Sequence, residues 1–352
     1  MVERTLVFLF GLFASFWILS SVVRSVVIPR PERVWLTVTA FRVSRWISHS
    51  VSRMLPIAMR HRVLGAFAPA VLIALPLIWS AGLILSFSCL YWAVGVGSWG
   101  ASIGFSGSSI TTLGFVAAPN SAAQAIAVIE ALIGLGIVAL MISFLPALYG
   151  TFSSREIAVG KLTTRAGAPP NPVTLLTRLA SLGDLGESEK ATWPEWEDWF
   201  VELGETHTSF PALIYFRSAN PDHSWLTAAE TALDTAALTK ACRIASDSGE
   251  ADLMLRSGMI ALRGIADYYR IPPELPEFDE AELSIDRAQL ERVVRTLVSA
   301  GVVKEPVPED AWEVFAGWRT NYDRSIVGLR TLVGDVSNYW DEDCEMQVIR
   351  HG

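Results

Sequence analysis

The amino-acid sequence predicts an all-α membrane protein with an all-α soluble domain at its C-terminal end. Three observations lead to this fold class. Glu130 is the only charged residue between Arg62 and Arg155, and a charge at bilayer depth is costly. The chain is 51% hydrophobic with a mean hydropathy of +0.37, which is too apolar for an ordinary soluble protein. The remaining charges gather in the second half, in segments that have helical periodicity.

The two halves of the chain differ in the sign of their charge. Residues 1–165 carry 12 Lys and Arg against 4 Asp and Glu, whereas residues 166–352 carry 16 against 32. The acidic half is long enough to bury a core of its own, and its charge argues against a nucleic-acid partner. Three cysteines (Cys89, Cys242 and Cys344) show neither a disulfide framework nor metal-ligand spacing, so we expect no metal site and a reducing cytosol.

Residues 1–29 are predicted to form an N-terminal membrane-spanning helix. The apolar run from Leu6 to Ile28 is long enough to cross a bilayer and is interrupted only by Arg24. A cleaved signal peptide is the alternative. We favour a retained helix, because Arg4 is balanced by Glu3 and no clear small-residue cleavage site precedes Arg24.

Residues 30–62 are predicted to form a basic amphipathic segment that lies on anionic lipid headgroups. They contain seven arginines and one acid, Glu32, with Trp35 and Trp46 among the apolar positions. A solvated linker is the alternative. The positive charge places this segment in the cytoplasm, so the short N-terminus faces outside.

Residues 63–154 are predicted to form two further spans around a re-entrant segment. The spans run from Val63 to about Tyr91 and from Ser121 to Tyr149, with Asn120 as the N-cap of the second. The uncharged stretch between them is rich in Gly and Ser and too short to cross, so it must be shielded by protein or line a water-filled cavity. Tyr91, Trp92 and Trp99 are expected to form an aromatic girdle at the outer face.

The re-entrant stretch contains a sequence that we call the TTLGF segment: Thr111, Thr112, Leu113, Gly114 and Phe115. A dehydrated cation needs several oxygen ligands at once, which a row of backbone carbonyls supplies, and glycine permits the positive φ that such a row requires. Each chain has one copy, so a pore would need several subunits. A re-entrant turn that packs helices in a non-conducting protein is the alternative.

The stretch from Val63 to Arg155 resembles the pore domain of tetrameric potassium channels. The TTLGF segment with Val116 lies where that family has TVGYG. The resemblance implies an outer helix, a pore helix, a filter and an inner helix, in a homotetramer. Phe115 in place of Tyr loses a hydroxyl, and Val116 in place of Gly resists positive φ. We therefore expect poorer discrimination between K⁺ and Na⁺ than two filter glycines would give.

Four residues of the predicted inner helix are candidates for supporting or gating roles. Glu130 either faces a cavity and concentrates cations or braces the filter through hydrogen bonds; the resemblance favours the brace. Gly134 and Gly136 are either hinges or sites of close helix packing. Pro146 is expected to kink the helix near a gate, although a kink without a gate is equally compatible with the sequence.

Residues 155–172 are predicted to be a linker and residues 173–352 an acidic helical cytoplasmic domain. The predicted helices cover residues 173–183, 192–205, 224–247, 250–270, 286–300 and 309–340. Trp193, Trp196 and Trp199 recur every three residues, as a stripe that packs into a core does. The domain contains no phosphate-binding loop, nucleotide fingerprint or nucleophile motif, so we expect no enzyme.

Together these features favour a homotetrameric cation channel, for potassium or weakly selective for monovalent ions, that the cytoplasmic domain gates or assembles. The permeant ion is the only ligand expected, and no cofactor is implied. The chain is expected in a bacterial-type inner membrane as a multi-pass protein with its C-terminal domain in the cytoplasm. The alternative is a non-conducting, membrane-anchored scaffold or receptor whose helical domain binds a partner.

Overall fold

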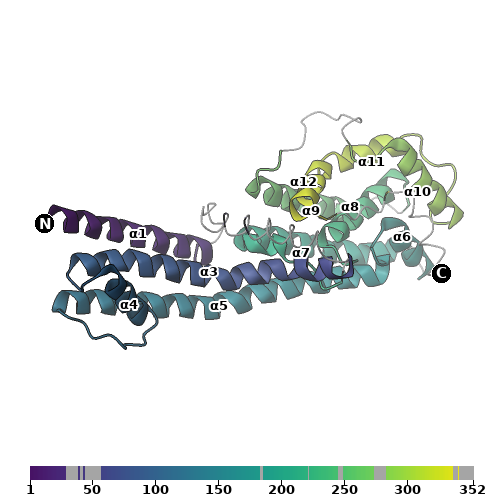
Figure 1. Cartoon of the computed structure of the whole chain (residues 1–352). Coiled ribbons are helices and arrows are strands. Elements are labelled where there is room, and N and C mark those ends of the chain that lie inside the picture. Colours follow the sequence, from purple (N-terminus) through teal and green to yellow (C-terminus); the bar gives the residue numbers. More distant parts are fainter. Residues whose placement is uncertain are drawn as a thin grey trace. The chain divides into compact units, whose positions relative to one another are not determined.

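The computed structural model describes residues 1–28, 39, 43, 57–182, 185–220, 222–244, 249–272, 283–335 and 340. Within these residues every regular element is a helix, so the predicted all-α class is confirmed. The chain divides into two compact units, Met1–Gly150 and Thr151–Gly352 (Figure 1). We call them the membrane unit and the soluble unit. The predicted amphipathic segment 30–62 lies largely outside the described residues.

Three helices of the chain are long and apolar enough to span a membrane, as predicted. They are α1 (Val2–Val26), α3 (Ile57–Ala93, apolar from Gly65) and α5 (Ser121–Ala166). A short helix, α4 (Trp99–Ile110), lies between α3 and α5 in the chain and packs on α3, as α1 also does. The membrane unit thus has three helices that could span a membrane and one helix that is too short to cross.

Small residues allow the helices of the membrane unit to approach closely. A Cβ atom on Gly11 of α1 would lie 2.7 Å from the carbonyl oxygen of Ser86 on α3, so only glycine fits there. The outer faces of the helices are apolar, with exposed side chains on α5 such as Ile129, Leu132 and Ile142. Such surfaces suit lipid or a neighbouring subunit.

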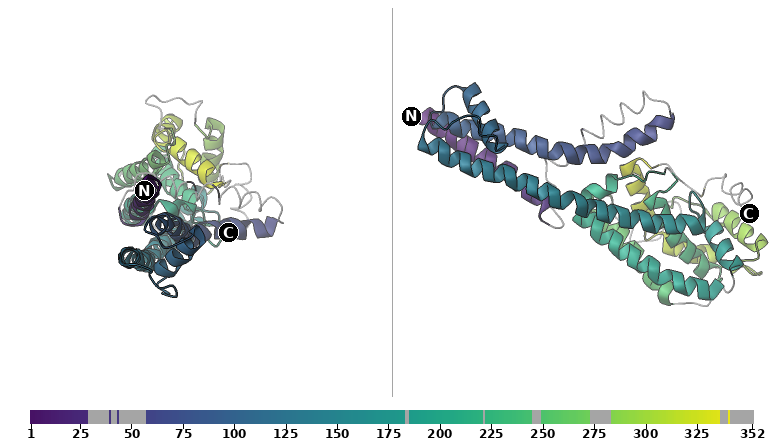
Figure 2. Two further views of the ribbon diagram at one scale, coloured as in Figure 1. Left: turned by 60° about the vertical axis from the view of Figure 1, so that its left-hand side comes forward. Right: turned by 90° about the horizontal axis from the view of Figure 1, so that it is seen from below.

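Figures 1 and 2 both show the N-terminus of α1 and the short helix α4 at the same end of the membrane unit. Asn120 fixes the start of α5 at that end. Its side-chain oxygen accepts a hydrogen bond of 2.8 Å from the Ala123 amide, and its amide group donates to the carbonyl of Val94. Asn120 is therefore the N-cap that the sequence predicts.

The soluble unit is built around α8 (Trp225–Ala241), in which every residue except Lys240 is buried. Around it lie the end of α5 and six other helices: α6 (Pro172–Ser181), α7 (Leu185–Ser209), α9 (Gly249–Tyr268), α10 (Arg287–Ser299), α11 (Ala311–Arg319) and α12 (Asp323–Val333). A 3₁₀ turn, η1 (Pro211–Tyr215), follows α7. Trp193, Trp196 and Trp199 are all buried in one core, as expected.

Several predicted boundaries differ from the structure: the helix expected over 192–205 is α7, which runs from Leu185 to Ser209, and the helix expected over 224–247 is α8, which ends at Ala241. The expected linker 155–172 is helical up to Ala166, and Val159 and Leu162 of this stretch are buried in the soluble core, so a connector is found only at residues 167–171. The expected helix 309–340 breaks at residues 320–322 into α11 and α12. The break lets Tyr322 turn inward and donate a hydrogen bond to Asp234.

Candidate functional site

The short helix α4 carries the TTLGF segment at its C-terminal end. The side chain of Ser98 caps the start of α4 by accepting a hydrogen bond from the Ala101 amide. Phe105 anchors the helix, since its ring meets Tyr91 of α3 edge-on with centroids 4.7 Å apart. The helix ends at Ile110, and Thr111 is its C-cap. The segment therefore begins at a fixed point inside the membrane unit.

The backbone of the TTLGF segment folds back on α4 through its amide groups. The amide of Thr112 donates to the carbonyl of Ser109 at 3.0 Å, and those of Leu113 and Gly114 donate to the carbonyl of Ser108 at 3.1 and 3.3 Å. A trans peptide holds each carbonyl antiparallel to the amide that follows it. The carbonyls of Thr111, Thr112 and Leu113 therefore point away from α4.

Two residues of the segment adopt left-handed backbone conformations. Thr112 has φ 57° and Gly114 has φ 65°. Glycine takes this conformation freely, but a β-branched residue such as Thr112 takes it at a cost of about 1–3 kcal/mol. Strain of this kind persists where the surrounding contacts impose it and is common at functional sites. Val116 is not among the described residues with positive φ.

The TTLGF segment is exposed in the single chain. Leu113 and Phe115 are 71% and 68% exposed, and no Cβ contact lies within 4 Å of Gly114. Irregular backbone at membrane depth is tolerated only where protein shields it or where it lines water. Within the described residues, Leu113 and Phe115 are not covered by other parts of the chain.

Glu130 is fully buried behind α4. Its two carboxyl oxygens accept hydrogen bonds from the hydroxyl of Tyr91 on α3, at 2.7 Å, and from that of Ser106 on α4, at 2.5 Å. Glu130 thus links three helices through neutral hydroxyl groups. This geometry supports a brace rather than a cavity-facing acid.

Tyr91 lies elsewhere than predicted. Trp92 and Trp99 stack with centroids 5.2 Å apart, in keeping with the expected aromatic girdle. Tyr91 instead turns inward, is fully buried and bonds to Glu130, so its place in the girdle is wrong. The sequence near Trp92 and Trp99 does not indicate whether a tyrosine there lies at the membrane interface or is buried.

The three other candidates on the inner helix differ in their surroundings. A Cβ on Gly134 would lie 2.1 Å from the carbonyl oxygen of Ile110, the last residue of α4, whereas Gly136 has open space around it. Gly134 is therefore a close-packing position. Pro146 lies inside α5, which continues as helix to Ala166. Ile142, four residues earlier, receives no amide hydrogen bond from it.

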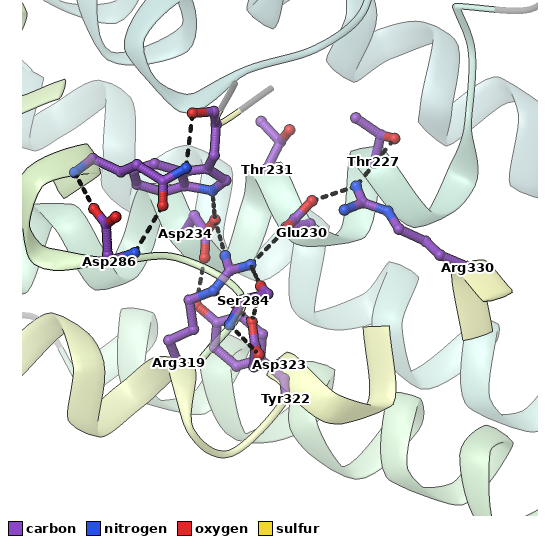
Figure 3. A network of polar contacts seen from close by, with 12 residues as sticks. Thr227, Glu230, Thr231, Asp234, Ser284, Asp286, Arg319, Tyr322, Asp323 and Arg330 are labelled. Atoms are coloured by element: carbon purple, nitrogen blue, oxygen red, sulfur yellow. Dashed lines mark hydrogen bonds and ion pairs between the residues drawn. The ribbon is translucent and has the colours of Figure 1, made fainter. Parts of the chain in front are cut away.

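A second set of buried polar residues lies in the soluble unit, around Arg319 (Figure 3). Its guanidinium contacts three acids: Glu230 at 2.7 Å, Asp234 at 2.5 Å and Asp323 at 2.8 Å. Burial by itself lowers the pKa of Arg319, but these carboxylates hold it well above its usual value. Burial raises the pKa of Glu230, against the pull of Arg319 and Arg330.

Further donors complete this network. Tyr322 donates to one oxygen of Asp234 and the indole of Trp340 to the other, and Ser284 donates to both oxygens of Asp323. Every carboxyl group is therefore satisfied, as a buried polar network requires. Its sequence signal is the i,i+4 spacing of Glu230 and Asp234, the two acids of α8, which our sequence analysis did not use. We assign the network to the stability of the soluble unit.

Arg155 forms a smaller buried cluster in the soluble unit. Its guanidinium donates to the carbonyl of Leu213 at 3.2 Å and to that of Phe216 at 2.7 Å, and it lies 3.4 Å from Nε2 of His207. Burial, reinforced by the charge of Arg155, lowers the pKa of His207 well below its usual value. Arg155 therefore fastens the turn after α7 to the end of α5. Within the described residues no group of three metal-ligating side chains gathers.

Comparisons with known protein families, curated proteins and solved structures find no match to this chain.

Proposed function

We propose that this chain is one subunit of a homotetrameric cation channel, for potassium or weakly selective for monovalent cations. Four TTLGF segments around an axis would line the narrow part of the pore. The number four follows from the resemblance to potassium channels, since one chain supplies one segment. Ions would pass passively, and no cofactor is needed.

The observation that carries the proposal is the direction of the peptide groups in the segment. The amides of Thr112, Leu113 and Gly114 donate hydrogen bonds to carbonyls at the end of α4. The carbonyls of Thr111, Thr112 and Leu113 therefore point to the exposed side. Carbonyl oxygens that face an axis replace the water molecules of a dehydrated cation. The same amides close the C-terminus of α4 as a Schellman motif, in which Thr112 bonds to Ser109 and Leu113 to Ser108.

The supports of the segment fit the same function. Glu130 joins α3 and α4 to α5 at Ser106, one turn before the end of α4, and Gly134 lets α5 touch the end of α4. A filter has to hold its oxygens at fixed separations, so the residues that pack against it must be rigidly placed. Glu130 is proposed as the brace and Gly134 as the contact point, while Pro146 is proposed to lie near a gate.

The soluble unit is proposed to assemble or gate the pore from the cytoplasm. The last turns of α5, including Val159, Leu162 and Ala166, are buried in its core. The helix that follows the filter is thus also part of the domain. The charge distribution favours an outside N-terminus and a cytoplasmic C-terminal domain in a bacterial-type inner membrane.

Weak selectivity is part of the proposal. Of the residues from 111 to 116, only Thr112 and Gly114 have positive φ, whereas a filter with two glycines has a further flexible position. Val116 leaves fewer aligned oxygens at the outer end, so fewer dehydrated sites are available.

Flux from potassium-loaded liposomes tests the proposal. We expect the purified chain to release K⁺, and Gly114→Ala to reduce the rate roughly tenfold or more, because alanine pays about 1–2 kcal/mol for a left-handed backbone. Gly107→Ala is the matched control, since Gly107 lies in α4 with space around it. A wild-type chain without flux for any monovalent cation would instead favour a non-conducting scaffold.

A further inference from the structure

Ser108 holds the TTLGF segment at two separate points. Its backbone carbonyl accepts the amides of Leu113 and Gly114, while its side-chain oxygen accepts the amide of Val116 at 3.3 Å. The residue is 1% exposed, although the segment that it holds is exposed. One buried serine of α4 therefore contacts both the middle and the outer end of the segment.

The hydroxyl contact is the critical one for the outer end. Among the described residues of the membrane unit, it is the one hydrogen bond that ties residues 115–119 to α4. The next anchor along the chain is Asn120, which bonds to Val94 of the turn after α3. Without the Ser108 hydroxyl, nothing polar would fix the peptide between Phe115 and Val116.

That peptide carries the outermost carbonyl of the segment. Because the Val116 amide points at Ser108, the carbonyl of Phe115 points away from α4, as do those of Thr111, Thr112 and Leu113. The Ser108 hydroxyl thus orients the Phe115 carbonyl away from α4, like the carbonyls of residues 111–113, with the Gly114 carbonyl between them in the chain. It does so where Val116 does not adopt the left-handed conformation.

We propose that Ser108 is a positioning residue that sets the ion selectivity of the outer end of the filter. This inference rests on the proposed channel function. The hydroxyl fixes the Phe115 carbonyl, so each subunit contributes one more oxygen to the outer site. When the hydroxyl is removed, the peptide can rotate and the site loses ligands. Selectivity depends on the number and placement of such ligands.

The test compares three proteins in planar bilayers with K⁺ on one side and Na⁺ on the other. Ser108→Ala removes the hydroxyl that holds Val116. Ser102→Ala is the matched control, because Ser102 is on the same helix, is also fully buried and has a hydroxyl without a hydrogen-bond partner in the described part of the chain. The reversal potential gives the permeability ratio of K⁺ to Na⁺, and light scattering gives the subunit number.

We expect Ser108→Ala to lower the permeability ratio roughly twofold to tenfold, the range that one ordinary hydrogen bond represents. Subunit number and the Ser102→Ala ratio should remain those of the wild type. If Ser108→Ala does not assemble, an ester in place of the amide at Val116 removes the same hydrogen bond from the donor side. The ester also makes the Phe115 carbonyl a weaker ligand, so it should lower the ratio at least as much.

The outcomes separate the two levels of inference. A wild-type chain that passes no cation ends the channel proposal and this inference with it. A wild-type chain that conducts, with an unchanged ratio in Ser108→Ala or in the ester variant, overturns the role of Ser108 alone. An equal fall in Ser102→Ala would also overturn it, because a general loosening of α4 would then explain the result.

Discussion

The two units of this chain bury carboxyl groups in opposite ways. In the membrane unit Glu130 is surrounded by neutral donors, the hydroxyls of Tyr91 and Ser106. In the soluble unit Glu230, Asp234 and Asp323 share the guanidinium of Arg319, and Arg330 adds a second positive charge beside Glu230. Both sets are fully or almost fully buried.

The difference shows what each acid requires of its neighbours. A carboxyl group whose partners are hydroxyls can be replaced by another polar group, because a hydroxyl can either donate or accept a hydrogen bond. A carboxylate among arginines cannot, because a guanidinium only donates, and loss of one partner leaves a buried charge uncompensated. The membrane unit should therefore tolerate substitution of its buried acid far better than the soluble unit.

Arg319→Met should have the largest effect. It removes the one group that contacts Glu230, Asp234 and Asp323 together, and breaking a buried pair typically costs about 3–5 kcal/mol. We expect the soluble unit to unfold at a much lower temperature, or not to fold, when followed by tryptophan fluorescence. Arg295→Met on the exposed side of α10 serves as the control. A thermal midpoint within a degree or two of the wild type would show that the network is not needed.

Matched amide substitutions test the comparison itself. Glu230→Gln turns an N–H₂ group toward a guanidinium, so we expect the free energy of unfolding of the soluble unit to fall by several kcal/mol. Glu130→Gln keeps a partner for both hydroxyls, so oligomers and flux should persist. Glu130→Ala removes the acceptor of the Tyr91 hydroxyl, at about 1–3 kcal/mol, and leaves Ser106 bonded to the carbonyl of Ile84 alone. If the two glutamates were equally sensitive to amide substitution, the proposed difference between the two units would be wrong. If Glu130→Ala left oligomers and flux unaffected, Glu130 would not be a brace.

The two glycines of the inner helix should respond differently to substitution by alanine. In Gly134→Ala the new methyl group would collide with the carbonyl of Ile110, and overpacking costs typically about 1–3 kcal/mol. Gly136→Ala has room and should be neutral or slightly stabilising, since alanine favours helix. The fraction of protein that stays oligomeric after heating measures both. If Gly136→Ala were the damaging change, Gly136 would be a hinge and the packing interpretation would be wrong.

The smallest effect concerns acid stability in the soluble unit. His207 is buried beside Arg155, and its pKa in the folded protein lies well below the ordinary value. As the pH falls below about 6.5, this histidine takes up a proton in the unfolded chain but not in the folded one. The free energy of unfolding therefore decreases as the pH falls, by at most about 1.4 kcal/mol per pH unit. Between pH 6.5 and 5 the thermal midpoint of His207→Gln should fall less steeply than that of the wild type. A slope in His207→Gln equal to that of the wild type would contradict this prediction.

The spans and the core stripe were predictable because each rests on a period or a length. Charge avoidance between Arg62 and Arg155 located α3 and α5, and the spacing of Trp193, Trp196 and Trp199 predicted their burial. The TTLGF segment was singled out because it lies between two apolar runs and resembles the TVGYG sequence of potassium channels. The predicted role of Asn120 as a cap depends on one local hydrogen bond and is confirmed.

Contacts between distant segments could not be predicted in this way. Ser106, Ser108 and Tyr91 look like ordinary small or interfacial residues, and their roles depend on how α3, α4 and α5 meet. Glu230 and Asp234 have i,i+4 spacing, but their partner Arg319 lies more than 80 positions away, so the spacing does not reveal the network that they form. The helical extension of α5 to Ala166 also escaped prediction, because basic residues after a span look like the start of a linker.

The symmetry of purified particles in detergent tests the central claim most directly. The account predicts a fourfold axis, with the carbonyl oxygens of Thr111, Thr112 and Leu113 from four chains facing it and Glu130 behind them, in contact with Tyr91 and Ser106. Electron microscopy of single particles would resolve this arrangement. A monomer or dimer in which Gly114 faces lipid would contradict the account.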